Sequence, residues 1–118
     1  MPGIQRTFIP GRELWLTMRA DLGAEADVPE GGAKCVAVNN KPYALFKVGG
    51  RVYALDNRCT HVGGPLCEGD LEGSIVTCPW HGSRFDVRSG QVVGPPARVP
   101  VRSHSVTVEG GRVFAEIP

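Results

Sequence analysis

The sequence lacks any long hydrophobic run, and its charges nearly cancel. No stretch approaches the roughly 20 apolar residues that a membrane-spanning helix requires, and residues 1–10 lack the apolar core of a signal peptide. The 13 Lys and Arg against 12 Asp and Glu leave a formal net charge of +1, which gives no reason to expect a polyanionic partner. We therefore expect a soluble, cytoplasmic protein that binds neither membrane nor nucleic acid.

The chain has only four cysteines. Without a secretion signal, two disulfides are not expected and metal ligation is favoured. Cys59 and Cys78 are the expected ligands. Cys35 lies in an apolar, strand-like run and is expected to be a small buried hydrophobic residue. Cys67 lies in a loop and is expected to be a bystander, with a spare ligand or a redox thiol as alternatives.

Glycine and proline are abundant, at 16 and 10 residues, which favours many turns between short strands. Two Gly-Gly pairs, Gly49-Gly50 and Gly110-Gly111, have the composition of two-residue hairpin turns. They would join strands at residues 43–48 and 52–56, and at residues 106–108 and 113–117. Further strands are expected at residues 14–17, 35–38, 75–77 and 84–87, and residues 20–26 could form a helical turn. This pattern predicts an all-β sandwich or barrel.

Two short motifs carry the chemistry of the chain: Cys59-Thr60-His61 and Cys78-Pro79-Trp80-His81, with sixteen residues between them. Each motif offers one thiolate and one imidazole, and glycine follows closely on both, so the two lie in turn-rich loops. Such a pair of loops suits a two-iron site in which each metal has its own ligand type. Asp56 and Asn57 precede the first loop and should shape its entry, whereas His104 lies outside both loops and is expected to be a surface or strand residue.

The wider pattern is more specific than either motif alone. It adds Gly64-Pro65-Leu66, Gly82, Phe85-Asp86, Ser89-Gly90 and Pro95-Pro96. In this combination the chain resembles the small soluble Rieske-type ferredoxins of ring-hydroxylating oxygenase systems, over residues 28–118 and most specifically over 58–96. The resemblance implies one all-β domain over residues 1–118. A cluster-binding subdomain at about 58–96 would be inserted into an antiparallel base domain at about 12–57 and 97–118.

The resemblance also implies one [2Fe–2S] cluster, with Cys59 and Cys78 on the inner iron and His61 and His81 on the outer iron. Two ferric ions and two sulfides sum to +2. Two thiolates therefore leave the oxidised centre neutral, whereas four would make it −2. An electron enters the neutral site more easily, so His ligation raises the potential from about −400 mV to a window of roughly −150 to +300 mV.

The surroundings of the cluster predict where in this window the potential lies. They are expected to comprise Gly64, Pro65, Trp80, Gly82, Ser83, Phe85, Pro95 and Pro96. Ser83 stands where high-potential respiratory Rieske proteins have a hydrogen-bonding serine, but Phe85 replaces their tyrosine and cannot donate. Gly64 and Trp80 replace two further cysteines that form a disulfide in those proteins. Both departures predict a potential near the low end, at about −150 mV. Pro95 and Pro96 would form a third, stiff loop over the cluster. Trp80 would contribute to an apolar docking surface for redox partners.

The leading functional hypothesis is a one-electron carrier that passes electrons from a flavin-dependent NAD(P)H reductase to a terminal oxygenase. The sequence shows neither a substrate pocket nor a mononuclear-iron ligand set, so the chain is not expected to be an enzyme by itself. One alternative makes it the small Rieske subunit of a nitrite-reductase-type complex. Another, from a different class, is a structural zinc-binding module, because four ligands suffice for one tetrahedral zinc ion.

Overall fold

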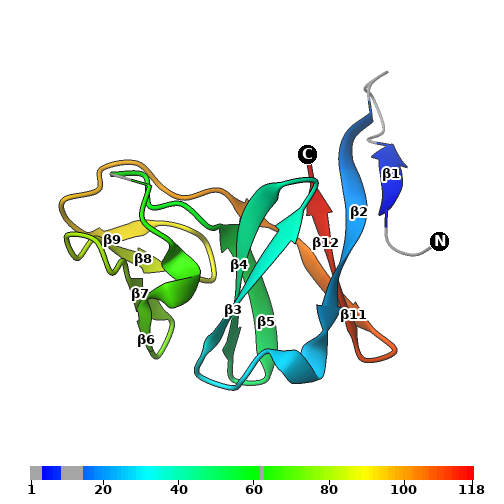
Figure 1. Cartoon of the computed structure of the whole chain (residues 1–118), viewed down its shortest axis with the longest axis horizontal. Helices are drawn as coiled ribbons and strands as arrows, with labels where there is room; N and C mark the ends of the chain where they lie inside the picture. Colours follow the sequence, from blue (N-terminus) through cyan, green and yellow to red (C-terminus); the bar gives the residue numbers. More distant parts are fainter. Residues whose placement is uncertain (1–3, 9–14, 62) are drawn as a thin grey trace.

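The described residues form three antiparallel sheets of four strands each (Figure 1). The computed structural model describes residues 4–8, 15–61 and 63–118, and within these ranges side chains from residue 18 onward. The first sheet has the order β1(Ile4–Phe8), β2(Trp15–Ala24), β12(Arg112–Ile117), β11(Val106–Glu109). The second has the order β10(Ser103–His104), β5(Arg51–Asp56), β4(Lys41–Val48), β3(Ala33–Val38). The third has the order β6(Asp70–Glu72), β7(Ile75–Thr77), β8(Arg84–Asp86), β9(Val92–Gly94).

The all-β fold expected from the sequence is confirmed. The helical segments of the described residues are two single 3-10 turns, η1(Glu25–Asp27) and η2(Leu66–Glu68), and none has the length and apolarity to span a membrane. The helical turn expected at residues 20–26 is wrong except at its end. The chain there continues as β2, because Ala20 and Leu22 alternate into the core with the period of a strand. Residues 12–14, which include parts of an expected strand and of the expected base domain, lie outside the described residues.

Both predicted hairpins are confirmed. Gly49 and Gly50 join β4 to β5 with φ of +59° and +79°, and Gly110 and Gly111 join β11 to β12 with φ of +56° and +76°. Positive φ at both central residues is the type I′ turn, which glycine adopts without steric cost. The Glu30 carboxylate accepts hydrogen bonds from the Gly49 and Gly50 N–H groups at 2.8 and 2.7 Å. This contact fixes the first turn to the segment that leads into β3.

The second sheet is buried on both faces, because it lies between the other two (Figure 1). Tyr43 and Leu45 of β4 pack in one core cluster with residues of β2 and β12. Their neighbours Ala44 and Phe46 point the opposite way and pack in a second cluster with residues of η2, β7 and β8. The four residues form a continuous buried run, and the third sheet therefore shares its core with the second.

A disulfide joins Cys35 of β3 to Cys67 of η2, with a Cα–Cα distance of 5.2 Å. Two expectations are therefore wrong: Cys35 is exposed rather than buried, and Cys67 is no bystander. Val36 and Val38 pack against the core between the first and second sheets, so the intervening positions of this edge strand face the other way. On that face η2 packs against β3, which brings the two sulfurs together.

Candidate metal centre

The two Cys/His motifs lie in loops that backbone hydrogen bonds close on themselves. The first motif follows β5 and the second connects β7 to β8. Cys59 donates its N–H to the Gly64 carbonyl at 2.9 Å and accepts from the Gly63 N–H at 2.8 Å. Cys78 donates its N–H to the Ser83 carbonyl at 2.7 Å. Each loop thus turns back at its cysteine and carries its histidine on the tip.

The two motif cysteines are buried side by side. Each is 2% exposed, and both remain thiols. Burial raises the pKa of the Cys78 thiol, and the neighbouring Cys59 side chain raises it further, against the Trp80 N–H that lies 3.4 Å from the Cys78 sulfur. Two adjacent buried thiolates would repel each other unless a cation compensates their charge. The pair therefore suits a metal that displaces the thiol protons as it binds.

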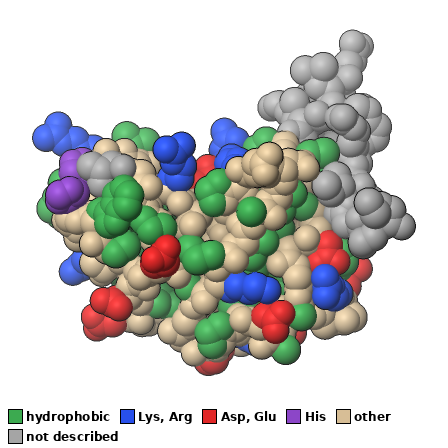
Figure 2. All heavy atoms as spheres, in the orientation of Figure 1, with side chains coloured by type: hydrophobic (Ala, Val, Ile, Leu, Met, Phe, Trp, Pro, Cys, Tyr) green, Lys and Arg blue, Asp and Glu red, His purple; other side chains and the backbone are tan. Residues whose placement is uncertain are grey.

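The two motif histidines lie at the surface. Both are exposed, and their ring centroids are 5.7 Å apart with the ring planes at 84°. His81 has φ of +70°, a left-handed conformation that residues other than glycine rarely adopt. Figure 2 shows histidine side chains close together at the end of the molecule that carries the third sheet, next to hydrophobic side chains. Two imidazoles from separate loops thus lie side by side at the surface.

Gly64 leaves the space in which the thiols and a metal group fit. A Cβ at this position would lie 2.6 Å from the Cys78 sulfur and 3.1 Å from the Trp80 Cβ and Cγ atoms. Contacts below 3.0 Å are essentially never seen for real Cβ atoms. The absence of a side chain at Gly64 is therefore what lets the first loop approach the second.

A third segment, residues 95–99, is tied to both loops. Ser83 is fully buried, and its hydroxyl accepts a hydrogen bond from the Ala97 N–H at 3.0 Å. Thr60, between the ligand candidates of the first loop, donates its hydroxyl to the Val99 carbonyl at 2.6 Å. The sequence predicted a loop at Pro95 and Pro96 in this segment. It assigned no role to Thr60, because the spacing of the ligands gives no information about this hydrogen bond.

Residues beside the loops complete the surroundings. Phe85 is fully buried in the core shared by the second and third sheets and has no donor to offer. Asn57 is buried, and its side-chain oxygen accepts from the Cys67 N–H at 2.7 Å, which connects the start of the first loop to η2. His104 lies on β10 and is not a surface residue: its side chain is 3% exposed and its Nε2 atom is 2.8 Å from Asp56.

Comparisons with known proteins identify the family of the chain. A sequence profile described as the Rieske [2Fe-2S] domain matches residues 19–105. The ferredoxin component of the naphthalene 1,2-dioxygenase system of Pseudomonas aeruginosa is 37% identical over 105 residues, covering 89% of this chain and 97% of its own.

Solved structures of ferredoxins have a similar fold. The ferredoxin of Sphingomonas yanoikuyae B1 superposes with a TM-score of 0.80 at 33% identity, covering 85% of this chain and 99% of its own. The ferredoxin in a complex of reduced oxygenase and oxidised ferredoxin in carbazole 1,9a-dioxygenase superposes with a TM-score of 0.77 at 34% identity, covering 82% and 91%.

Proposed function

The chain belongs to the Rieske [2Fe–2S] domain family, and we propose that it is the ferredoxin component of a ring-hydroxylating oxygenase system. It takes single electrons from a flavin-dependent NAD(P)H reductase and delivers them to a terminal oxygenase, in the cytoplasm. The observation that carries this proposal is the pairing of two buried thiols with two exposed imidazoles in facing loops. The chain is an electron carrier and not itself a catalyst.

We propose Cys59 and Cys78 as the ligands of one iron and His61 and His81 as the ligands of the other. When bound, the cluster supplies a reversible one-electron couple. The residues of the chain do the remaining work. The buried thiols anchor the group, and the exposed imidazoles bring it to the surface, where a partner protein can approach closely.

The residues near the ligands favour a low potential within the Rieske window. The Ser83 hydroxyl accepts from Ala97, which leaves its own hydrogen available to donate toward the ligand pocket. Phe85 offers no hydrogen-bond donor. Gly64 and Trp80 stand at the two positions where high-potential respiratory Rieske proteins have the cysteines of a disulfide. We therefore propose a potential near the low end, at about −150 mV.

The apolar surface beside the imidazoles suits a redox partner. Trp80 is 50% exposed and Val99 is 59% exposed, and both belong to segments that contact the first loop through Gly64 and Thr60. Exposed aromatic side chains commonly anchor protein–protein contacts. We propose that the oxygenase and the reductase both dock on this surface. We also propose that the chain is one domain whose cluster-binding part spans about residues 58–96.

Zinc is not the metal that this arrangement favours. Ligand atoms around one zinc ion lie about 2.0–2.3 Å from it and so within about 4 Å of one another. Among the described residues, Cys59, His61, Cys78 and His81 do not form a group whose ligand atoms all lie within 4.8 Å. Two pairs of ligands suit two metals.

Metal analysis and spectroscopy of purified protein test the proposal. We expect two irons and two acid-labile sulfides per chain, a red-brown colour, and a paramagnetic signal on one-electron reduction. Cys78→Ser and His81→Ala should lose the iron or change the signal, whereas the control His104→Gln should keep both. A colourless zinc protein, or a cluster that is unchanged in Cys78→Ser and His81→Ala, would overturn the proposal.

A further inference from the structure

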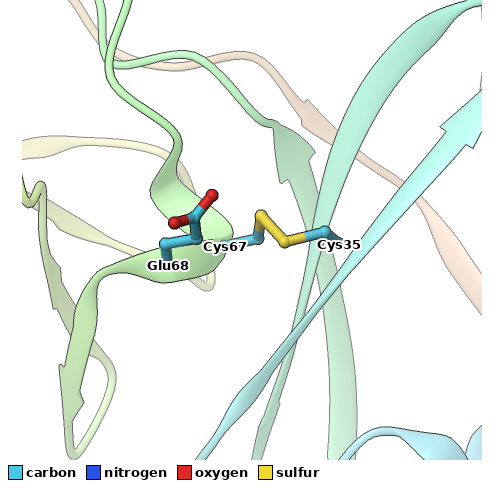
Figure 3. Close-up of side chains that lie close together, drawn as sticks. All are labelled: Cys35, Cys67 and Glu68. Atoms are coloured by element: carbon cyan, nitrogen blue, oxygen red, sulfur yellow. A yellow bond between two sulfur atoms is a disulfide. The ribbon is translucent and has the colours of Figure 1, made fainter.

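We propose that the Cys35–Cys67 disulfide is a second redox site, which dithiol reductants open and whose opening loosens the first metal-binding loop. Figure 3 shows the disulfide running from β3 of the second sheet to η2, with the Glu68 carboxylate beside it. The bridge spans 32 residues of sequence. In a cytoplasmic protein, stable disulfides are rare and those that occur are commonly catalytic or redox-sensing. This step rests on the proposed location of the protein.

The geometry makes Cys35 the sulfur that an external thiolate attacks. Cys35 is exposed and lies on β3, the edge strand of its sheet. Cys67 is 8% exposed. Access decides which sulfur of a disulfide is attacked, so the mixed disulfide forms on Cys35 and the Cys67 sulfur is the leaving group.

Asn57 prepares Cys67 to leave. Its side-chain amide donates to the Cys67 sulfur at 3.0 Å, and its carbonyl oxygen accepts from the Cys67 N–H at 2.7 Å. This two-point contact holds a donor on the sulfur on which negative charge develops. A leaving thiolate that receives a hydrogen bond leaves faster.

Glu68 acts in the opposite sense. Its carboxylate and the two sulfurs all lie within 4.8 Å of one another, and Glu68 is exposed. A negative charge at this distance repels the incoming thiolate and disfavours thiolate on either cysteine. Glu68 therefore slows the opening of the bridge by an incoming thiolate.

The exchange balances as an ordinary two-step thiol–disulfide reaction. One thiolate of a dithiol reductant bonds to the Cys35 sulfur as the Cys35–Cys67 bond breaks, and the Cys67 thiolate takes up a proton. The second thiolate of the reductant then attacks the reductant sulfur that is bonded to Cys35. This releases Cys35, which is protonated. The reductant ends as a disulfide and the protein has gained two electrons and two protons.

Opening the bridge reaches the metal-binding loop through Asn57. Asn57 lies two residues before Cys59, and its N–H donates to the Pro42 carbonyl of β4 at 3.2 Å. With the disulfide closed, η2 is fastened covalently to β3 and, through Asn57, to the start of the first loop. With it open, only packing and hydrogen bonds hold η2, so the first loop opens more often and the cluster is lost sooner.

Thiol mapping tests the exchange without depending on the cluster. The purified holoprotein is treated anaerobically with a dithiol protein reductant of the thioredoxin type, trapped with an alkylating agent, and analysed by peptide mass spectrometry. We expect alkylated Cys35 and Cys67 in the folded protein, and we expect the bridge to re-form, with release of two glutathione molecules, when glutathione disulfide is added to the reduced protein. Glu68→Gln should be reduced about two to five times faster, as loss of one nearby charge predicts. Cysteines that stay blocked until the protein unfolds, or that are already thiols before reduction, would overturn the proposal.

Cluster lifetime tests the coupling. The visible absorbance of the holoprotein is followed in the presence of an iron chelator, with the bridge closed and after reduction. We expect cluster loss to become several times faster on reduction, and Cys35→Ser, which keeps Cys67 and its contact with Asn57, to lose its cluster at the fast rate regardless of reductant. Equal rates in all these samples would refute the coupling, even where thiol mapping has shown exchange.

Discussion

At the scale of single residues, Gly64 sets the approach of the two ligand loops. Gly64→Ala would place a methyl group 2.6 Å from the Cys78 sulfur, so the loops must move apart or the cluster cannot assemble. We expect iron content and visible absorbance to fall several-fold while the chain remains folded. The matched control is Gly94→Ala, where the nearest atoms belong to the Arg84 side chain at 3.2–3.4 Å. A Gly64→Ala protein that holds a full complement of iron would contradict this reading.

Ser83 has two roles that one substitution can separate. In Ser83→Ala the buried Ala97 N–H loses its acceptor, which should lower the free energy of unfolding by about 1 to 3 kcal/mol. If the hydroxyl also donates toward the cluster, as we propose, the midpoint potential should fall as well. Denaturant unfolding and a redox titration measure the two effects, with the exposed Ser89→Ala as control. A loss of stability with no change of potential would refute the donation toward the cluster. Ser83 would then serve only to hold residues 95–99.

At the scale of the strands, an ion pair between β2 and β12 makes stability depend on pH. Burial alone would raise the pKa of Asp21, but Arg112 at 3.0 and 3.2 Å and the Gly23 N–H at 2.9 Å outweigh it and hold that pKa below its ordinary value. The carboxylate therefore stabilises the fold above the ordinary Asp pKa of about 3.9. This stabilisation disappears as the pH falls through the lowered pKa of the folded state.

Asp21→Asn should consequently be less stable than the parent at pH 7 by about 0.5 to 1 kcal/mol, because Arg112 is half exposed. The difference should shrink as the pH falls below about 3.9. Urea unfolding followed by circular dichroism at a series of pH values measures it, with Asp70→Asn on β6 as control. A difference that is the same at pH 7 and in strong acid would show that the charge of Asp21 is not its cause.

The strands also show how far the sequence alone could go. The two Gly-Gly hairpins were predictable because the turn depends on local backbone freedom at Gly49-Gly50 and Gly110-Gly111. The strands β1, β6, β9 and β10 were missed. Shortness alone does not explain this, because β7 and β8 are as short as β6 and β9 and were expected. The Cys35–Cys67 pairing was missed because it depends on η2 packing against β3, which no local pattern encodes.

The metal site divides in the same way. Its four candidate ligands stand out because thiol and imidazole must recur at short spacing within each loop. The supports supplied by Thr60 and Ala97 do not stand out, because a backbone carbonyl or N–H leaves no mark in the sequence. Asn57 was recognised only as lying at the entry to the first loop, and its bond to the Cys67 sulfur required the fold.

At the scale of the whole molecule, the exposed histidines lie at one end of a layered arrangement of sheets. The central sheet is buried on both faces, and the third sheet shares its core with one of them. The ligand loops are therefore mounted on a packed base, with their two cysteines buried and their two histidines exposed. A partner that docks on the tips meets a surface already in place, which limits the reorganisation needed for electron transfer.

A substitution of Trp80 tests whether partner proteins dock on the tips of the ligand loops. Trp80→Ala removes the 50% exposed side chain but keeps the backbone N–H that lies 3.4 Å from the Cys78 sulfur, so iron content and midpoint potential should stay close to those of the parent. If the ring anchors partner proteins, electron transfer to a cognate oxygenase should weaken about ten-fold or more, as expected for an interface hot spot. The control is Val108→Ala, a 39% exposed residue on β11 of the first sheet. Stopped-flow reoxidation of the reduced protein by the oxygenase, at several oxygenase concentrations, separates weaker docking from slower transfer. Equal rates for the parent and both variants would place the partner surface elsewhere on the molecule.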